Sequence, residues 1–405
     1  MLKIIRLRVS SSFAQLKLKK EADRRLKAGH LWIYSNEVDV AQTPLSQFEA
    51  GQLVELLNSA GKSLGLAHIS PKNLICARLL TRKTADVDAK WWVKKLREAL
   101  ALREAFFTTP HYRLVYGEAD YLPGLVIDRF GEGFVVQTST AGMDAQLELI
   151  VEGLKRVFQP EFVCIKNDSK AREMEGLAIT VDCPIGTAPE EIEICENGVQ
   201  FVAPLVGGQK TGWFYDHRDN RHKLNQWVGD KTVLDVFSYV GGWGVQAAAH
   251  GASRVVCVDS SAQALEYVGA NAELNGCLDK VEALQGKAID ALKMLINNGE
   301  KFDAVVVDPP AFIKKRKDHR NGLAGYRHIN ELAMRLVDNG GLIVSASCSM
   351  HLKNDELVDV MRGASRHIDR RCQLVAEGGQ AADHPIHPAI AETKYLKAVF
   401  ARISH

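Results

Sequence analysis

The clearest indication of fold is the stretch Phe302-Asp303-Ala304-Val305-Val306-Val307-Asp308-Pro309-Pro310-Ala311-Phe312. A run of apolar β-forming residues is typical of a strand buried on both faces of a parallel sheet. The two prolines end that strand, because proline has no amide hydrogen with which to extend the ladder. The Asp308 carboxylate is therefore expected at the carboxyl edge, where open α/β sheets bind ligands.

A second apolar run lies at residues 341–346 and leads directly into Ser347-Cys348-Ser349. If both runs are parallel strands of one sheet, their carboxyl ends meet at the same edge. We therefore expect the thiol of Cys348 and the carboxylate of Asp308 to face one cleft.

Strand and helix patterns alternate from about residue 197 onward. Strands are expected at 232–236, 254–258, 280–284, 304–307 and 342–346, and helices at 245–250, 262–275, 289–297, 326–337 and 354–366. This alternation predicts the α/β class, with a Rossmann-like doubly wound sheet and right-handed crossovers. Residues 395–403 would close the sheet.

The first half of the chain shows two further segments. Residues 1–80 are predicted to form a β-rich domain with strands at 4–9, 51–57 and 65–69. Residues 83–190 are predicted to form a small α/β domain, and its expected elements are helices at 88–107 and 146–158, a hairpin within 113–134 and a strand at 161–166. The acidic stretch 182–196 is the expected linker to the last domain, residues 197–405.

A basic segment from Lys19 to Lys27 is followed by the aromatic residues Trp32 and Tyr34. Basic side chains beside aromatic rings suit phosphate contact and base stacking. The alternative is a solvated helix face closed by a tryptophan that only packs.

The composition is that of a globular protein, with 46% hydrophobic and 25% charged residues among 405. No apolar run approaches the length of a membrane span, and the N-terminus lacks the apolar core of a signal peptide, so we expect a cytoplasmic protein. The eight cysteines form no Cys-x-x-Cys pair, which argues against a zinc site or a disulfide scaffold. Because the net charge is only +2, any nucleic-acid surface must be a local patch.

The stretch from Asp235 to Gly244 leads from a strand into a helix and contains three glycines. Asp259 ends the next strand, and 259 − 235 = 24, which is near the spacing at which an acid meets a ribose in nucleotide-binding units. The glycines do not fit Gly-x-Gly-x-x-Gly, and an acid at Asp235 would repel a diphosphate but attract a sulfonium. The pattern therefore favours S-adenosylmethionine over a nicotinamide cofactor, and a plain structural turn is the alternative.

Cys348 is a candidate nucleophile, although most buried cysteines are inert small hydrophobes. Pyrimidine C5 is a weak nucleophile, and a thiolate that adds to C6 turns the ring into an enamine whose C5 can attack a sulfonium methyl. Asp308, protonated or sharing a proton with cytosine N3, would stabilise the developing charge and could hold the exocyclic amine. The sequence does not name the base that removes the C5 proton.

A basic loop, residues 314–322, follows the Asp308 motif directly. Its lysines and arginines could clamp RNA phosphates. A mobile solvated linker is the alternative.

Nearly the whole chain resembles the bacterial 23S ribosomal RNA 5-methylcytosine methyltransferases of the large subunit methyltransferase I type. The motifs that carry the resemblance are Gly29-His30-Leu31-Trp32-Ile33-Tyr34-Ser35, Gly117 to Arg129, Lys210 to Arg221, Phe237-Ser238-Tyr239-x-Gly241-Gly242, Asp308-Pro309-Pro310-x-Phe312, Gly325-Tyr326-x-x-Ile329-Asn330, Ser347-Cys348-Ser349 and Ala381-Ala382-Asp383-His384-Pro385.

The resemblance implies an N-terminal PUA domain, a central α/β domain and a C-terminal methyltransferase domain that methylates cytosine C5. It implies Cys348 as the nucleophile, and it places the segment from Gln209 to Arg221 near the active site. The partner that the resemblance implies is 23S rRNA or a large-subunit assembly intermediate. The resemblance does not decide whether the chain forms a homodimer. The resemblance and the ends of the predicted strands together give the residues that we expect around S-adenosylmethionine. They are Asp235, Phe237, Ser238, Tyr239, Gly241, Asp259, Ser260, Asp290, Asp308 and Pro309.

One position departs from the family pattern. Many such enzymes carry an acid after the third strand that holds the adenine amine, but this chain has Gly286-Lys287-Ala288. Lysine cannot accept that hydrogen bond, so adenine would rely on backbone groups or on Asp290 through water. Two other functions also stay open. They are methylation at guanine N7 or an exocyclic amine, and an RNA-binding assembly factor that has lost its cofactor.

Overall fold

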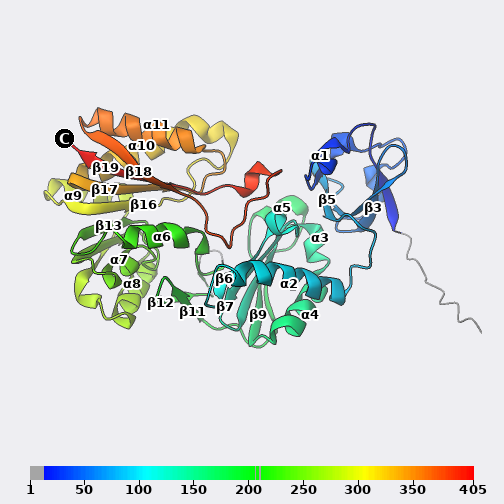
Figure 1. Ribbon diagram of the computed structural model, residues 1–405, viewed down its shortest axis with the longest axis horizontal. Helices are drawn as coiled ribbons and strands as arrows, with labels where there is room; N and C mark the ends of the chain where they lie inside the picture. The colour runs from blue at the N-terminus through cyan, green and yellow to red at the C-terminus, as the bar shows by residue number, and fades with distance from the viewer. Residues whose placement is uncertain (1–12, 206, 209–210) are drawn as a thin grey trace, which may run out of the picture.

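The computed structural model describes residues 13–205, 207–208 and 211–405 (Figure 1). Their strands form two five-stranded sheets, a two-stranded sheet and a seven-stranded sheet, in chain order. We call the parts built on the three larger sheets the N-terminal, central and C-terminal units. The exact domain boundaries stay predictions. In the described part of the chain, no helix is long and apolar enough to cross a membrane.

The N-terminal unit is built on a five-stranded sheet with strand order β1-β3-β4-β5-β2. Its strands are β1 (Ala14–Lys17), β2 (Trp32–Tyr34), β3 (Leu53–Leu57), β4 (Ser63–Ile69) and β5 (Ile75–Thr81). The strand expected at 4–9 lies outside the described residues. The basic segment forms only one helical turn, α1 (Arg24–Lys27), because residues 20–23 form a turn with a left-handed backbone angle at Glu21, φ 66°, and Lys19 bonds to Glu37.

The central unit has strand order β10-β9-β8-β7-β6. Its elements are α2 (Ala89–Glu104), β6 (His111–Tyr116), β7 (Leu125–Phe130), β8 (Gly133–Thr138), α3 (Ala141–Asp144), α4 (Leu147–Phe158), β9 (Phe162–Asn167), α5 (Ala171–Glu175) and β10 (Thr180–Ile185). The linker expected at 182–196 is wrong, because this stretch carries the end of β10 and all of β11 (Glu191–Glu196). β11 pairs with β12 (Val199–Pro204), so its backbone groups are satisfied in a ladder.

The C-terminal unit confirms the predicted doubly wound sheet, with strand order β15-β14-β13-β16-β17-β19-β18. All its strands are parallel except β19, which is antiparallel to both neighbours. The elements are α6 (Arg218–Asn225), β13 (Thr232–Val236), α7 (Gly244–Ala249), β14 (Arg254–Asp259), α8 (Ala262–Leu274), β15 (Val281–Gln285), α9 (Ala288–Asn297), β16 (Phe302–Val307), α10 (His319–Leu336), β17 (Val337–Ser347), α11 (Asn354–His367), β18 (Arg371–Gly378) and β19 (Lys397–Ser404).

Two apolar clusters cover the two faces of this sheet. In β16, Ala304 and Val306 pack into the cluster that contains α7 and α8, while Val305 and Val307 pack into the cluster of α9, α10 and α11. Successive side chains of a strand point to opposite faces. A continuous run of valines is therefore what a strand buried on both faces requires, as the sequence predicts.

The loop that joins β18 to β19 leaves the C-terminal sheet and reaches the other two units (Figure 1). Ile390 is fully buried in the apolar core of the N-terminal unit. Asp383 accepts the backbone amide of Arg113 of the central unit at 3.0 Å. We call residues 379–396 the clasp, since this one loop contacts all three units.

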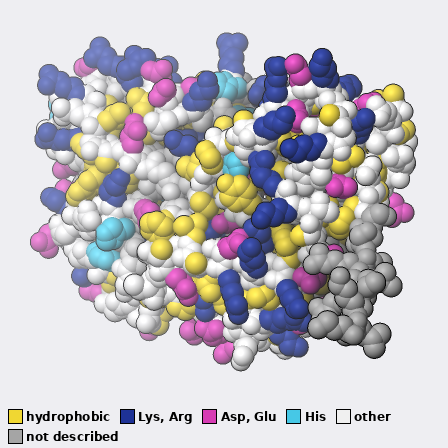
Figure 2. Space-filling view, turned by 45° about the vertical axis from the view of Figure 1, so that its right-hand side comes forward, with side chains coloured by type: hydrophobic (Ala, Val, Ile, Leu, Met, Phe, Trp, Pro, Cys, Tyr) yellow, Lys and Arg dark blue, Asp and Glu magenta, His cyan; other side chains and the backbone are white. Residues whose placement is uncertain are grey.

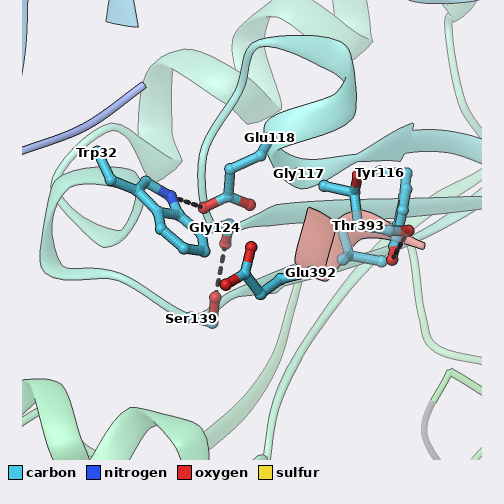
Figure 3. Close-up of a pocket in the computed structure, with 9 residues that line it drawn as sticks. Trp32, Tyr116, Gly117, Glu118, Gly124, Ser139, Glu392 and Thr393 are labelled. Atoms are coloured by element: carbon cyan, nitrogen blue, oxygen red, sulfur yellow. Dashed lines mark hydrogen bonds between the residues drawn. The ribbon is translucent and has the colours of Figure 1, made fainter. Parts of the chain in front are cut away.

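Trp32 lies at the junction that the clasp completes (Figure 3). Its indole nitrogen donates to Glu118 Oε1 at 2.9 Å, and Tyr116 donates its hydroxyl to Thr393 O of the clasp at 3.2 Å. Glu118 and Glu392 line a cavity of about 150 Å³ there. This arrangement favours the alternative in which Trp32 packs, since its polar edge is already bound within the protein.

Candidate active site

A cavity of about 550 Å³ opens at the carboxyl edge of the seven-stranded sheet. Its size suits a nucleoside-bearing ligand. Five strand ends supply its lining: Phe237, Ser238 and Tyr239 after β13, Asp259 and Ser260 at and after β14, Gly286, Lys287 and Ala288 after β15, Asp308, Pro309, Pro310 and Ala311 after β16, and Cys348 after β17. The strand order reverses at β13, so the cavity lies where open sheets bind ligands.

The turn after β13 shapes one side of the cavity. Phe237 and Tyr239 have left-handed backbone angles, φ 69° and φ 51°, which are uncommon for residues other than glycine. Gly244 begins α7 close to the sheet, where an added Cβ would lie 2.4 Å from Cys257 Sγ. A glycine is therefore required for the helix to start this near the strand.

Asp259 is fixed by this turn. Its Oδ2 accepts the amide of Tyr239 at 3.0 Å, and its Oδ1 accepts the amide of Ser261 at 2.9 Å. A carboxylate can accept about four hydrogen bonds, so two acceptor positions are left for the hydroxyls of a ribose.

The residues around the turn fit S-adenosylmethionine. Ser238 is buried and its hydroxyl has no hydrogen-bond partner among the described residues, although the residue lines the cavity. A buried polar group left unpaired is costly, and a polar ligand atom would satisfy it. With the Asp259 carboxylate and the apolar walls of Phe237 and Ala288, the cavity offers a hydrogen-bonding edge and a surface for a flat base.

Three residues expected around the cofactor do not line the cavity. Asp235 is fully buried beneath it, and its Oδ2 accepts the amide of Gly244 at 2.8 Å. Burial raises the pKa of Asp235 to about 7. Gly241 shapes the turn through its positive φ of 88°, and Asp290 is exposed on α9. Lys287 does line the cavity, so the departure from the family pattern lies at the site itself.

Asp308 sits between two side chains that the sequence did not single out. Trp243 donates its indole N–H to Oδ2 at 3.2 Å, and His217 Nε2 lies 3.3 Å from Oδ1. Burial alone would raise the pKa of Asp308, but His217 and the hydrogen bonds from His217 and Trp243 outweigh it and hold this pKa below its usual value. Asp308 is therefore a carboxylate at neutral pH, which argues against the protonated form considered above.

Asn220 sets the orientation of His217. Its amide nitrogen donates to Gly379 O at 2.8 Å and lies 3.1 Å from His217 Nδ1. Because the carbonyl of Gly379 can only accept, the amide nitrogen is assigned to this side and donates to Nδ1 as well. Nδ1 then accepts this bond, so the ring proton that faces Asp308 lies on Nε2 and His217 donates to Asp308.

Cys348 is half-buried at the end of β17 and lines the same cavity as Asp308. The hydroxyl of Tyr326 holds the turn around it through hydrogen bonds of 2.8 Å with Ser347 Oγ and Ser349 Oγ. The expected convergence of thiol and carboxylate on one cleft is thus found.

The segment from residue 211 to Arg221 supplies the remaining wall through Trp213, Phe214, Asp216, His217 and Arg221, while residues 209–210 lie outside the described residues. Arg221 is buried and donates to Glu196 Oε1 at 2.7 Å. The family resemblance predicts that this segment lies near the active site, but it assigns no role to the individual residues. Nothing in the local pattern shows that Asp308 and His217 meet.

Substitution of Asp259 by alanine is expected to weaken binding of S-adenosylmethionine at least about tenfold, because hydrogen bonds to a charged group contribute roughly 1.5–3 kcal/mol each. Calorimetric titration of the full chain measures this. Asp290→Ala is the matched control, and its affinity should not change, since Asp290 does not line the cavity. Equal losses in the two variants would contradict the assignment.

Comparison with known proteins agrees with this geometry. Residues 16–82 match the PUA-like domain family, and residues 180–373 match the S-adenosylmethionine-dependent methyltransferase family. The chain is 33% identical to ribosomal RNA large subunit methyltransferase I of Klebsiella pneumoniae strain 342 over 402 residues, covering 97% of this chain and 99% of that protein. The same protein of Aliivibrio fischeri strain MJ11 is 35% identical over 392 residues, covering 95% and 98%.

A solved structure shares the fold along the chain. A Streptococcus mutans protein assigned as a S-adenosylmethionine-dependent methyltransferase superposes with a TM-score of 0.80 at 21% identity, covering 96% of this chain and 100% of that chain. A second such structure, solved with S-adenosylhomocysteine, gives 0.81 at 21% identity with the same coverage. These comparisons confirm the predicted α/β methyltransferase fold with an N-terminal PUA-like domain.

Proposed function

The chain belongs to the ribosomal RNA large subunit methyltransferase I family, and on that basis we propose that it methylates C5 of a cytosine in 23S rRNA through a covalent bond between Cys348 and C6. The substrate is the RNA itself or a large-subunit assembly intermediate in the cytoplasm. The observation that carries the proposal is that Cys348 and Asp308 line one cavity with Ser238 and Asp259.

The first step is addition of the Cys348 thiolate to C6, which makes C5 nucleophilic. When bound, S-adenosylmethionine supplies the methyl group as an electrophile beside this C5. The C5 proton then passes to solvent, and the double bond is restored as the thiolate leaves.

Asp308 orients the base in this proposal. As a carboxylate held by His217 and Trp243, it can accept a hydrogen bond from the exocyclic amine of cytosine. As the sulfur adds, ring N3 takes a proton from water and donates it in a hydrogen bond to the Asp308 carboxylate, so negative charge does not build up on the ring. The His217 contact keeps the carboxylate facing the cavity.

RNA contact is proposed for the exposed basic side chains. Figure 2 shows Lys and Arg side chains in a band that runs down the face on which the N-terminal unit comes forward. Lys314, Lys315, Arg316 and Lys317 are exposed directly after the cavity residues of β16. Positive side chains of this kind bind phosphates and set the register of the RNA.

Release of tritium tests the position of methylation. Ribosomal RNA with tritium at cytosine C5 is expected to release one tritium to water for each methyl group transferred. Methylation at guanine N7 or at an exocyclic amine would transfer methyl groups with the tritium retained. Absence of both methyl transfer and calorimetric cofactor binding, with RNA still bound, would instead support an assembly factor.

A further inference from the structure

A buried lysine lies behind the nucleophile and has no part in the chemistry described so far. Lys397 begins β19 and pairs with Ser347 of β17 across the antiparallel ladder. The residue is 6% exposed, and its Nζ donates to Ser349 O at 2.6 Å and to Tyr395 O at 2.7 Å. The ammonium is thus bound to the turn that carries Cys348.

This ammonium has no carboxylate in direct contact among the described residues, although the charge of Glu356 acts on it from a distance. Among the described residues, no carboxylate lies within ion-pair distance of Lys397, and its two acceptors are neutral carbonyls. Charges buried in proteins are usually paired, because removing an isolated charge from water is costly. An anion that forms in the adjacent cavity would complete the pair.

Cys348 is the group placed to supply that anion. It adjoins Ser349, whose carbonyl binds the ammonium, and it interacts electrostatically with Lys397. The other titratable groups around the pair have their own partners or the wrong sign. Glu356 on α11 is paired with His319 at 3.0 Å, and Tyr326 on α10 is bound to two serines. Asp308, Asp216 and His217 line the same cavity as Cys348.

We propose that Lys397 is a positioning residue whose ammonium holds Cys348 as the thiolate, both before it adds to C6 and when it departs. The inference rests on the proposed function of Cys348 as the nucleophile. The thiol proton passes to water, and no proton is taken up by the lysine. The ammonium also offsets the negative field of the Asp308 carboxylate, which would otherwise disfavour a second anion in the cavity.

The electrostatics agree with this role. Burial lowers the pKa of Lys397 to about 8, and the charge of Cys348, followed by that of Glu356, acts in the opposite direction. The interaction is reciprocal, because a thiolate that favours the protonated lysine is itself favoured by that lysine. At neutral pH the lysine still carries its charge for most of the time.

Alkylation of Cys348 as a function of pH tests the proposal without RNA or cofactor. The full chain is treated with iodoacetamide and digested with trypsin, and the modified peptide 336–353, whose single cysteine is Cys348, is quantified by mass spectrometry. In the wild-type protein we expect the thiol to titrate below its ordinary value of about 8.5. In Lys397→Met the midpoint should rise by at least about one unit, so that alkylation at pH 7 slows about tenfold. Lys397→Arg should keep the midpoint near that of the wild-type protein.

Lys166→Met is the matched control. Lys166 is also buried, and its Nζ donates to two carbonyls, Leu205 O at 3.0 Å and Gly208 O at 2.8 Å. Its loss should perturb packing in a similar way and leave the Cys348 midpoint unchanged. A midpoint at or above the ordinary value in the wild-type protein would overturn the proposal, and this result needs no variant to fold. The same midpoint in Lys397→Met and wild type would also overturn it.

The two proposals can fail separately. If Cys348→Ser still methylates RNA while Lys397→Met shifts the alkylation midpoint, the nucleophile assignment is wrong and the electrostatic role of Lys397 stands. If Cys348→Ser is inactive and the alkylation midpoint of Lys397→Met equals that of the wild-type protein, Cys348 is still the nucleophile. Lys397 then only connects β19 to the turn.

Discussion

Cys348→Ser is expected to lose methyl transfer to cytosine by roughly 10³-fold or more, while its affinity for S-adenosylmethionine stays that of the wild-type protein. A serine hydroxyl is not ionised at neutral pH and does not add to C6. Without this addition C5 remains too weak a nucleophile to attack a sulfonium methyl. The measurement is incorporation of labelled methyl groups into ribosomal RNA, with calorimetry of cofactor binding on the same preparation.

Cys372→Ser provides the matched control for this variant. Cys372 is also partly buried, but it lies on β18 and does not line the cavity. The methyl-transfer activity of Cys372→Ser should remain within about twofold of the wild-type value, since substitutions away from a functional site usually change the free energy of unfolding only slightly. Wild-type rates in Cys348→Ser would rule out the covalent route and leave methylation of another atom as the better account.

Glu196→Gln is expected to reduce the free energy of unfolding by about 3–5 kcal/mol, because it leaves buried positive charge without its partner. Glu196 is 1% exposed at the end of β11. Its Oε1 accepts Arg221 Nη1 at 2.7 Å and Gln246 Nε2 at 2.8 Å, and its Oε2 accepts Trp213 Nε1 at 2.9 Å. Since Arg221 and Trp213 line the cavity, affinity for the cofactor should fall as well.

Urea denaturation followed by tryptophan fluorescence measures this loss, because Trp213 is bound to Glu196 directly. Glu282→Gln is the control: this glutamate also pairs with an arginine, Arg254 at 2.7 Å, but its side chain is 57% exposed. Exposed ion pairs contribute at most about 1 kcal/mol, so the free energy of unfolding of Glu282→Gln should barely differ from that of the wild-type protein. Equal losses of unfolding free energy in the two variants would show that burial of the Glu196 network contributes no additional stability.

The core of the C-terminal unit could be predicted because its strands leave a strong local signal. Val305, Val306 and Val307 place apolar side chains on both faces of the strand, and two prolines follow shortly after them. The strand, its burial and its carboxyl edge can therefore be predicted from the local sequence. The juxtaposition of Asp308 and Cys348 then follows from strand geometry. β18 was missed because most of its residues are exposed and polar residues interrupt its apolar ones, as is typical of an edge strand.

The contacts that tune the site could not be predicted in this way. His217 meets Asp308 and Lys397 meets the turn of Cys348 only because segments distant in sequence pack together. Asp235 was expected at the cofactor because it ends β13, but its side chain points to the helix start at Gly244. The direction of a side chain at a strand end depends on the turn that follows, and two left-handed residues define that turn here.

The central claim is that the Cys348 sulfur forms a bond with a cytosine of the RNA, and a trapped complex tests it most directly. RNA in which cytosine carries fluorine at C5 cannot lose a proton there, so the thiolate cannot leave and the adduct persists. After digestion with nuclease and trypsin, we predict a methylated fluorocytosine attached to Cys348 in peptide 336–353, formed only in the presence of S-adenosylmethionine. Methyl transfer to this RNA with no nucleotide on Cys348, or with the nucleotide on another residue, would contradict the account.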